Sequence, residues 1–375
     1  MAISLKSKVL DRIVLLVFSF MNYLKIDRLW QRCCQAAIAT LFVMITCTTA
    51  IVSHPQMAIA QDQRDQQNQQ DLEYWHQVEL PTDVTLLDLD FTDNQKVQHG
   101  WLVGTNSTLL ETTDGGETWQ PKKLDLGKIN YRFVSVSFNG DEGWIVGRPS
   151  LLLHTEDGGK SWQRIGLSSR LPGDPAMVTA LGPKTLEMAT DIGAIYRSED
   201  GARTWQALVR EAVGTTRNLF RSDDGRYIAV SAKGNFYSTW APGDRAWTPH
   251  NRNNSRRVQN MGYTPDGRIW MLNRGGVLQF SESSNTENWE EPQNPKAASG
   301  YGMLDMSFQD ANNVWVSGGS SRLLHSEDGG QTWHREEYLS NVGANFYRVF
   351  FFNHDRGFIL GQFGTLLTYD PENAT

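Results

Sequence analysis

Cysteine is almost missing from this 375-residue sequence, whose three cysteines, Cys33, Cys34 and Cys47, all fall in the first 50 residues. The rest of the chain therefore has no disulfide framework, no thiolate nucleophile and no cysteine-ligated metal. A surplus of basic residues is also lacking, since the formal net charge is −7, which argues against nucleic acid as the main partner. A hydrophobic content of 39% is ordinary for a folded protein and excludes a disordered or polytopic membrane chain.

The first 60 residues have the organisation of a secretory leader. Residues 36–52 form an uncharged apolar run that follows Arg28 and Arg32, and Ala58-Ile59-Ala60 supplies a small-x-small cleavage signal. A basic region, an apolar region and such a site together predict a signal peptide over residues 1–60. An uncleaved anchor is the alternative, because the run is at the lower limit for spanning a bilayer. Because the basic region is unusually long, translation from Met21 is also considered.

Cys47 offers a third mode of membrane attachment, as a lipid-anchored cysteine after lipoprotein cleavage. Thr46 precedes it, where such sites normally have Gly or Ala, and this disfavours lipidation. Residues 61–73, which begin QDQRDQQNQQD, are polar and of low complexity, with nothing to bury. We expect them to form a linker, followed by a folded domain over residues 74–371.

A repeat of about 43 residues fills that domain. Four clear copies end in tryptophan (TTDGGETW, TEDGGKSW, SEDGARTW and SEDGGQTW), and APGDRAW and SSNTENW are degenerate copies. The successive spacings of these six are 43, 43, 42, 42 and 44 residues, and a step of 44 back from the first copy reaches a seventh tryptophan. The equivalent residues are Trp75, Trp119, Trp162, Trp205, Trp247, Trp289 and Trp333.

Each repeat contains four short strand patterns, which in the second repeat cover residues 133–138, 143–147, 150–155 and 161–165. Four strands in this length match a propeller blade. After the last tryptophan only three strands follow, near 346–352, 357–361 and 365–369. The sequence therefore predicts an all-β fold, a seven-bladed β-propeller of four-stranded antiparallel blades. The N-terminal strand, residues 75–80, is expected to close the ring by pairing into the C-terminal blade.

The residues that recur between the repeats have a structural interpretation. In S/T-x-D-G-G-x-T/S-W the aspartate is expected to accept backbone N–H bonds in the turn between the third and fourth strands, and the glycines permit positive φ. One carboxylate in each turn is too few for a calcium site. His154 and His325 share one repeat position and are predicted to pack within blades. Rings at a second-strand position are expected to stack between blades: Trp101, Trp144, Trp270, Trp315 and Phe358. We predict no metal site, no cofactor and no catalytic residue.

Basic residues are concentrated in one sector. Residues 197–274 contain 12 Arg and 1 Lys against 7 acidic residues, whereas the rest of the chain is strongly acidic. Such an asymmetry favours an anionic partner. The turns from second to third strands and the loops entering first strands share one face of a propeller. These segments carry Arg132, Arg148, Arg217, Lys233, Arg256, Arg257, Arg274 and Arg348.

Strand periodicity places some of these side chains on one side. We align the expected ends of four first strands at Phe138, Arg221, Tyr263 and Phe352. An even number of residues separates each of these ends from one arginine, which keeps the four arginines on one side of the strand: Arg132, Arg217, Arg257 and Arg348. We expect the basic residues to surround one mouth of the channel, opposite the Asp-Gly turns. Arginine binds carboxylates through two parallel hydrogen bonds, which suits this surface to a carboxylate-bearing partner. A solvated face with local ion pairs is the alternative.

The repeats also resemble a known family. GWLVGTNSTLLETTDGGETW, GWIVGRPSLLLHTEDGGKSW, ATDIGAIYRSEDGARTW and GFILGQFGTLLTYD resemble the photosystem II stability/assembly factor family of cyanobacteria and chloroplasts. The resemblance implies a seven-bladed propeller at the lumenal side of the thylakoid membrane. It implies a non-catalytic factor that binds the newly made precursor of a reaction-centre core subunit and early assembly complexes; we expect a monomer. An arginine patch on one face is also implied, with candidates Arg197, Arg203, Arg217, Arg221, Arg252, Arg256, Arg257 and Arg274.

Two other functions are compatible with the scaffold. The SEDGGxTW boxes resemble sialidases at the level of the motif, and a sialidase needs an arginine cluster, an activated tyrosine with an acidic partner and a separate acid. Tyr131, Tyr301 and Tyr347 lie near first-strand starts, but few acids accompany them and the usual N-terminal arginine motif is missing. A generic peptide- or glycan-binding propeller is the third possibility, which only the family resemblance separates from the first.

Overall fold

The computed structural model describes residues 73–251, 255–284, 288–298, 300 and 302–372. The predicted leader, Cys47, most of the predicted linker, Arg252 and Tyr301 lie outside these residues. Leu72–Thr375 forms one compact unit. Within the described part of the chain, no helix has the length and apolar character needed to cross a bilayer.

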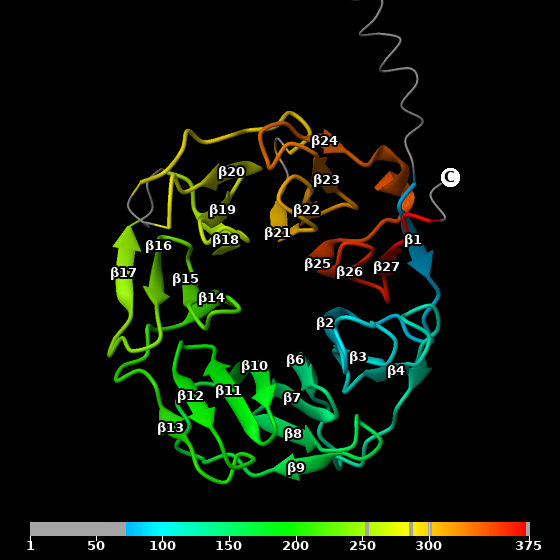
Figure 1. Ribbon diagram of the computed structural model, residues 1–375, viewed down its shortest axis with the longest axis vertical. Coiled ribbons are helices and arrows are strands. Elements are labelled where there is room, and N and C mark those ends of the chain that lie inside the picture. The colour runs from blue at the N-terminus through cyan, green and yellow to red at the C-terminus, as the bar shows by residue number, and fades with distance from the viewer. Residues whose placement is uncertain (1–72, 252–254, 285–287, 299, 301, 373–375) are drawn as a thin grey trace, which may run out of the picture. The chain divides into compact units, whose positions relative to one another are not determined.

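Seven antiparallel sheets form a ring, as predicted (Figure 1). The inner strands are β2 (Leu86–Phe91), β6 (Arg132–Asn139), β10 (Pro175–Gly182), β14 (Thr216–Arg221), β18 (Val258–Tyr263), β21 (Met303–Phe308) and β25 (Phe346–Asn353). The second strands are β3 (Gly100–Gly104), β7 (Glu142–Arg148), β11 (Thr185–Thr190), β15 (Tyr227–Ser231), β19 (Ile269–Asn273), β22 (Val314–Gly318) and β26 (Arg356–Gly361).

The third strands are β4 (Leu109–Thr112), β8 (Leu151–Thr155), β12 (Ile195–Ser198), β16 (Phe236–Trp240), β20 (Val277–Phe280), β23 (Leu323–Ser326) and β27 (Leu366–Tyr369). The outer strands are β5 (Gln120–Pro121), β9 (Gln163–Ile165), β13 (Gln206–Ala207), β17 (Thr248–Asn251), β24 (His334–Arg335) and β1 (Trp75–Val78), and a 3₁₀ turn, η1 (Glu337–Asn341), follows β24. Blade five has three strands, and two isolated bridges, Leu278↔Gln293 and Ser281↔Trp289, replace its outer strand. Its copy of the repeat lacks the Asp-Gly pair that precedes the outer strands of blades one, two, three and six.

The N-terminal strand closes the ring, as the repeat predicts. β1 pairs antiparallel with β27, with Trp75 opposite Tyr369 and Val78 opposite Leu366. The Trp75 ring lies edge-on to Trp315 of the preceding blade, at a centroid distance of 5.4 Å. One strand from the start of the domain thus completes the last blade, and its aromatic side chain fastens that blade to its neighbour.

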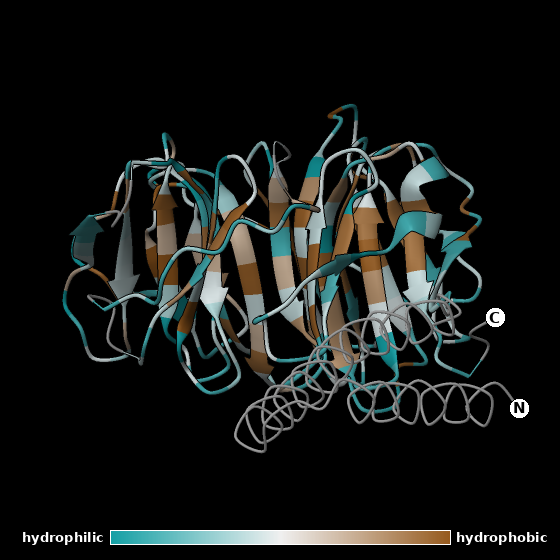
Figure 2. Cartoon of the chain, turned by 90° about the horizontal axis from the view of Figure 1, so that it is seen from above, coloured by the Kyte–Doolittle hydropathy of each residue, from teal (hydrophilic) through white to brown (hydrophobic). Residues whose placement is uncertain are grey.

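Large second-strand rings fill the spaces between blades. Trp101, Trp144, Trp270, Trp315 and Phe358 are all fully buried. Trp101 of blade one meets Trp162 of blade two edge-on at 5.9 Å, and its Nε1 donates to the Gly158 carbonyl at 3.0 Å. Figure 2 shows hydrophobic residues gathered along the strands and hydrophilic residues in the connecting loops. The core is therefore a series of aromatic layers between sheets, with the loops left free to vary.

The Asp-Gly turns have the predicted structural role. In the second blade, Asp157 Oδ1 accepts the Ser161 backbone N–H at 2.9 Å, and Oδ2 accepts its hydroxyl at 2.6 Å. These hydrogen bonds lower the pKa of Asp157 to about 2. Gly159 has φ of +91°, and a Cβ there would lie 2.3 Å from the Trp101 ring. The glycine thus permits both the turn and the close packing of the preceding blade.

Candidate functional site

Strand order determines which loops share a face. Because each blade is an antiparallel meander, the loops that enter inner strands and the turns between second and third strands lie at one face. We call this the entry face, and it includes residues 232–235, 255–257 and 274–276. The opposite face carries the Asp-Gly turns, including residues 114–118 and 199–204, and is called the Asp-box face. This division separates the predicted basic residues into two groups.

Four exposed arginines of blades four and five come together at the entry face, and we call them the arginine cluster: Arg217, Arg256, Arg257 and Arg274. Arg256 Nη1 donates to the Arg274 carbonyl at 3.1 Å, and Arg274 N donates to the Arg257 carbonyl at 2.9 Å. Partial burial, together with the charges of Arg274 and Arg257, lowers the pKa of Arg217. The charges of Arg257 and Arg274 thus act unfavourably on that of Arg217, and an anion bound at this face would relieve that repulsion.

A β-bulge positions Arg217 at the inner edge of this cluster. The register of β14 with β15 shifts between Thr216 and Asn218, so Arg217 is an extra residue without a ladder partner. Its Nη2 donates to the Ala232 carbonyl at 3.2 Å, and Nη1 donates to the Gln259 side chain of blade five. A one-residue shift occurs near the start of every inner strand. Bulges redirect side chains, and the bulge in β14 orients the Arg217 guanidinium.

The bulges also correct the predicted strand alignment. Phe351, not Phe352, pairs with the first glycine of the second strand in the way that Phe138 does. Arg348 therefore occupies the position of Asn218, one residue beyond that of Arg217. Counting in steps of two fails because the extra residue interrupts the alternation of the strand. The Arg348 guanidinium binds Asp88 of blade one and is separate from the arginine cluster.

Three other predicted residues lie on the entry face. Lys233 is exposed in the turn between β15 and β16, beside the arginine cluster. Arg132 and Arg148 are opposite each other in β6 and β7 of blade two, and Arg148 lies 3.5 Å from Asp191. The entry face therefore has one concentrated basic region over blades four and five and a smaller one at blade two.

The remaining predicted arginines lie toward the Asp-box face, so the predicted set does not share one surface. Arg203 is exposed within the Asp-Gly turn of blade three. Arg221 ends β14 and lies 2.9 Å from Glu187, while Arg197 lies 3.1 Å from Glu199 and 3.7 Å from Glu187. The family resemblance, applied to the basic sector, grouped these residues with the cluster. The direction of their strands separates them.

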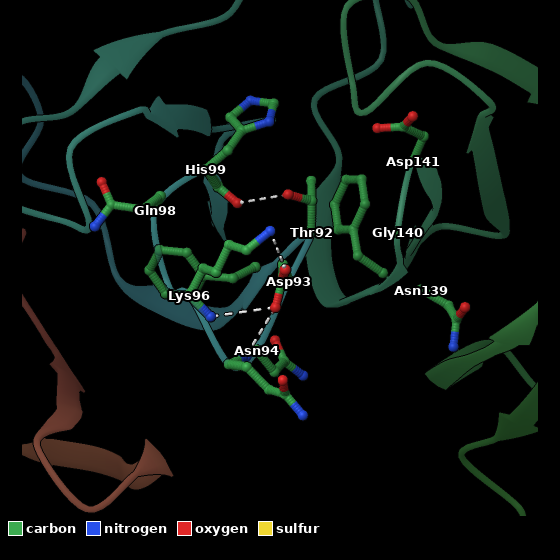
Figure 3. Close-up of a pocket in the computed structure, with 12 residues that line it drawn as sticks. Thr92, Asp93, Asn94, Lys96, Gln98, His99, Asn139, Gly140 and Asp141 are labelled. Carbon is green, nitrogen blue, oxygen red and sulfur yellow. Dashed lines mark hydrogen bonds and ion pairs between the residues drawn. The ribbon is translucent and has the colours of Figure 1, made fainter.

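Several cavities lie toward the Asp-box face among the described residues, and two of them are lined by ion-paired residues. One, of about 830 Å³ between blades three and four, is lined by Glu187, Arg197, Arg221 and Trp240 among others. The other, of about 700 Å³ between blades one and two, has Asp93, Lys96 and Asp141 on its walls (Figure 3). In the second, Lys96 pairs with Asp93 at 3.3 Å, and the Thr92 hydroxyl donates to the His99 carbonyl at 3.2 Å. These polar groups are hydrogen-bonded or ion-paired within the protein, and we assign no ligand to either cavity.

The two repeat-equivalent histidines stack on tryptophan rings, as expected of packing residues. The ring centroids of His154 and Trp144 are 3.8 Å apart, and those of His325 and Trp315 are 3.7 Å apart with an interplanar angle of 4°. Burial, with a smaller contribution from the charge of His334, lowers the pKa of His325 to about 3. Its imidazole is therefore neutral at physiological pH.

Tyr131, one of the tyrosines considered for sialidase chemistry, is not arranged as a nucleophile. The Tyr131 hydroxyl is buried without a hydrogen-bond partner among the described residues, and the Arg164 guanidinium lies over its ring at 5.6 Å. A nucleophilic tyrosine requires an acidic residue within hydrogen-bond reach, and Tyr131 has none. Tyr301, the second candidate, lies outside the described residues.

Comparison with known proteins gives consistent matches. The family described as Photosynthesis system II assembly factor YCF48 matches residues 67–370. The Photosystem II assembly lipoprotein Ycf48 of Trichormus variabilis is 58% identical over 300 residues, covering 80% of this chain and 88% of that protein. A solved structure described as YCF48 bound to D1 peptide has a TM-score of 0.77 and 52% identity, over 80% of this chain and 98% of that one.

A solved YCF48 from Cyanidioschyzon merolae has a TM-score of 0.75 and 44% identity, over 80% of this chain and 100% of that one. These two solved chains contain little beyond the propeller. In these relatives the propeller therefore folds without a further domain.

Proposed function

The chain belongs to the photosystem II assembly factor family YCF48, and on that premise we propose that it is a non-catalytic assembly factor that binds the newly made precursor of a reaction-centre core subunit through the arginine cluster. The bound segment is a lumenal peptide that carries carboxylates. Binding takes place early in reaction-centre assembly, and later folding of the partner or loading of its cofactors releases the factor.

The arginine cluster is the observation that carries this proposal. Partial burial and then the charges of Arg274 and Arg257 lower the pKa of Arg217, and all three residues are exposed. Such an arrangement costs electrostatic free energy in the free protein and is stabilised by an anionic ligand. Guanidinium groups bind carboxylates through paired hydrogen bonds, so a carboxylate-bearing peptide is the matching ligand. A relative solved with a D1 peptide supports a peptide partner.

Location follows from the same proposal. The leader over residues 1–60 exports the chain to the thylakoid lumen, where it stays at the lumenal side of the membrane. Several relatives are named lipoproteins, which supports attachment to the membrane. The entry face then meets partner segments that emerge into the same compartment.

The test is a binding measurement with synthetic peptides from the lumenal C-terminal region of the D1 precursor, followed by fluorescence anisotropy. The Arg217→Glu/Arg257→Glu/Arg274→Glu variant reverses three charges on the entry face. We expect it to weaken binding by at least tenfold and to flatten the dependence on salt. Lys160→Glu/Arg203→Glu/Arg245→Glu, which reverses three exposed charges on the Asp-box face, is the matched control and should bind like the wild type. Equal loss in both variants would assign the effect to overall charge and reject the cluster as the site.

A further inference from the structure

We propose that the propeller has a binding site for a Zn²⁺-like divalent transition-metal ion in blade six, formed by His325, His334 and Glu336. One ligand atom from each residue lies within 4.8 Å of the other two. The site belongs to no part of the arginine cluster, and it does not depend on the proposed partner. It is formed where β23, β24 and the start of η1 meet.

The distances fit an ion between the ligands. Glu336 Oε1 lies 3.4 Å from His334 Nε2 and 3.7 Å from His325 Nδ1. Zinc ligands at about 2.0–2.2 Å from a tetrahedral ion are about 3.4 Å from one another. The pairs are therefore too far apart for good direct hydrogen bonds and are close to the edges of a coordination tetrahedron. Two imidazoles and one carboxylate leave a fourth position for water.

Hydrogen bonds around the site orient His325 for coordination. Asn313 Nδ2 donates to Asp310 Oδ2 at 2.8 Å, so the amide oxygen of Asn313 faces the ring. That oxygen lies 3.2 Å from His325 Nε2, which must therefore donate its proton. The lone pair is left on Nδ1, facing the Glu336 carboxylate. Two acceptors that face each other in this way are stabilised by a cation between them.

Packing preorganises two of the three ligands. The side chains of His325 and Glu336 are only 6% and 8% exposed, and the Trp315 ring lies flat against His325. His334 is 54% exposed, so an ion can enter from solvent without opening the blade. Among the described residues, the ion-pair partners of Glu336 are these two imidazoles. A metal would neutralise a carboxylate that burial otherwise leaves poorly solvated.

The repeat provides an internal comparison. His154 of blade two is equivalent to His325 and also stacks on a tryptophan, but its cross-strand partner is Gln163, and Ile165 occupies the position of Glu336. There Glu142 Oε1 lies 2.6 Å from His154 Nε2 in a direct hydrogen bond, at the ring nitrogen that faces Asn313 in blade six. Stacking of the histidine on a tryptophan is therefore common to both blades and does not by itself make a metal site. Of blades two and six, blade six has the additional histidine and glutamate, His334 and Glu336.

Coordination would stabilise the closure of the ring. The ion joins β24 and Glu336 to β23, and two residues later the Tyr338 hydroxyl accepts the Trp75 backbone N–H at 3.1 Å. Trp75 begins the closing strand β1. An ion that fixes the start of η1 would thus also fix Tyr338, whose hydroxyl binds the first residue of β1. We therefore assign the ion a structural role.

The test is a titration of the propeller, residues 72–375 without a histidine tag, with zinc chloride after removal of metals by a chelator. We expect one equivalent to bind and the melting temperature to rise. His334→Ala, at an exposed position, should fold normally and lose at least tenfold in affinity. His334→Gln/Glu336→Ile, which copies blade two, should bind no zinc. His99→Gln, which removes the partner of Glu111, is the control and should bind one equivalent.

Cobalt supplies a second measurement that does not depend on stability. Co²⁺ in place of Zn²⁺ should give the strong visible absorption of a tetrahedral nitrogen and oxygen site in the wild type and in His99→Gln, and none in His334→Ala. Failure of the wild type to bind zinc at micromolar concentration would overturn the proposal, as would equal binding by His334→Ala. Peptide binding at the arginine cluster is unaffected by either result, so the two proposals are tested separately.

Discussion

Arg221 and Glu187 bind each other across the boundary between blades three and four: Arg221 Nε lies 2.9 Å from Glu187 Oε2, with side chains only 11% and 7% exposed. The Tyr227 hydroxyl donates to the same carboxylate oxygen at 3.1 Å. An arginine that charge counting assigns to a binding surface is thus a structural link between two blades. Its substitution should affect folding rather than recognition.

We predict that Arg221→Ala lowers the free energy of unfolding by about 3 kcal/mol, because it removes the nearest cation from the buried Glu187 carboxylate and leaves Arg197 at 3.7 Å as its ion-pair partner. Urea unfolding followed by tryptophan fluorescence would measure this. Arg203→Ala, at an exposed turn of blade three, is the control, with an expected change within about 0.5 kcal/mol. Affinity for the D1-precursor peptide should be equal in both variants and the wild type. A selective loss of affinity in Arg221→Ala would return this residue to the binding surface.

Stability should depend on pH in two opposite ways. Burial raises the pKa of Asp90 to about 7 and that of Asp305 to about 6. Between pH 4 and 7 the folded protein keeps protons that the unfolded chain has lost, so stability falls as the pH rises through this range. Urea midpoints from pH 4 to 8 should show the decrease. Asp90→Asn/Asp305→Asn should flatten it, and an unchanged slope would contradict the assignment.

Acid should act on the Asp-Gly turns. Bonds from the hydroxyl and backbone of the following Ser or Thr lower the pKa of Asp157, Asp200 and Asp328 to about 2. These carboxylates contribute stability that is complete above pH 4 and is lost as the pH falls toward 2. Asp157→Asn should lower stability at pH 6 and reduce the dependence on pH below 4. A variant with the same acid slope as the wild type would show that other groups are responsible.

Ring closure should depend on one side chain. Trp75 is buried against Trp315, Phe351 and Tyr369. We predict that Trp75→Ala destabilises the propeller by about 3–5 kcal/mol, the usual cost of removing a buried large aromatic ring. Chemical unfolding of the propeller would measure the effect. Ile129→Ala, at an exposed loop position, should change stability by less than about 0.5 kcal/mol. Similar stability of Trp75→Ala and the control would mean that β1 contributes little to closure.

Attachment to the membrane is tested at Cys47. If lipidation anchors the protein, Cys47→Ser should abolish incorporation of radiolabelled palmitate and release the protein from membranes at alkaline pH. Retention of the variant on membranes would favour an uncleaved apolar helix over residues 36–52. Cys33→Ser/Cys34→Ser controls for the other thiols.

Sequence periodicity predicted the fold closely because tryptophan, Asp-Gly turns and alternating strands recur in phase. The closing strand followed from counting strands after Trp333. The arginine cluster was predicted in part: Arg217, Arg257 and Arg274 do gather, since loop order within a repeat assigns a face. Arg197, Arg203 and Arg221 were misplaced because their grouping used the family resemblance and the basic sector without strand direction. Arg348 was misplaced because a bulge cannot be read from alternation.

The candidate metal ligands were missed for a different reason. His325, His334 and Glu336 have no recognised spacing, because a hairpin rather than a helix brings them together. A signal did exist in the sequence. Comparison of blades two and six at equivalent positions shows Gln163 and Ile165 where blade six has a histidine and a glutamate.

The seven bulges near the starts of the inner strands have a consequence for how such rings diversify. At this position each blade presents one residue outside its ladder, and none of the seven is buried: Leu87, Val134, Ala176, Arg217, Gln259, Leu304 and Tyr347. Substitution at these positions leaves every strand pair intact, so selection can alter them one at a time. The ring therefore offers a circular set of interchangeable positions, and a designer could change its ligand preference there without redesigning a single blade.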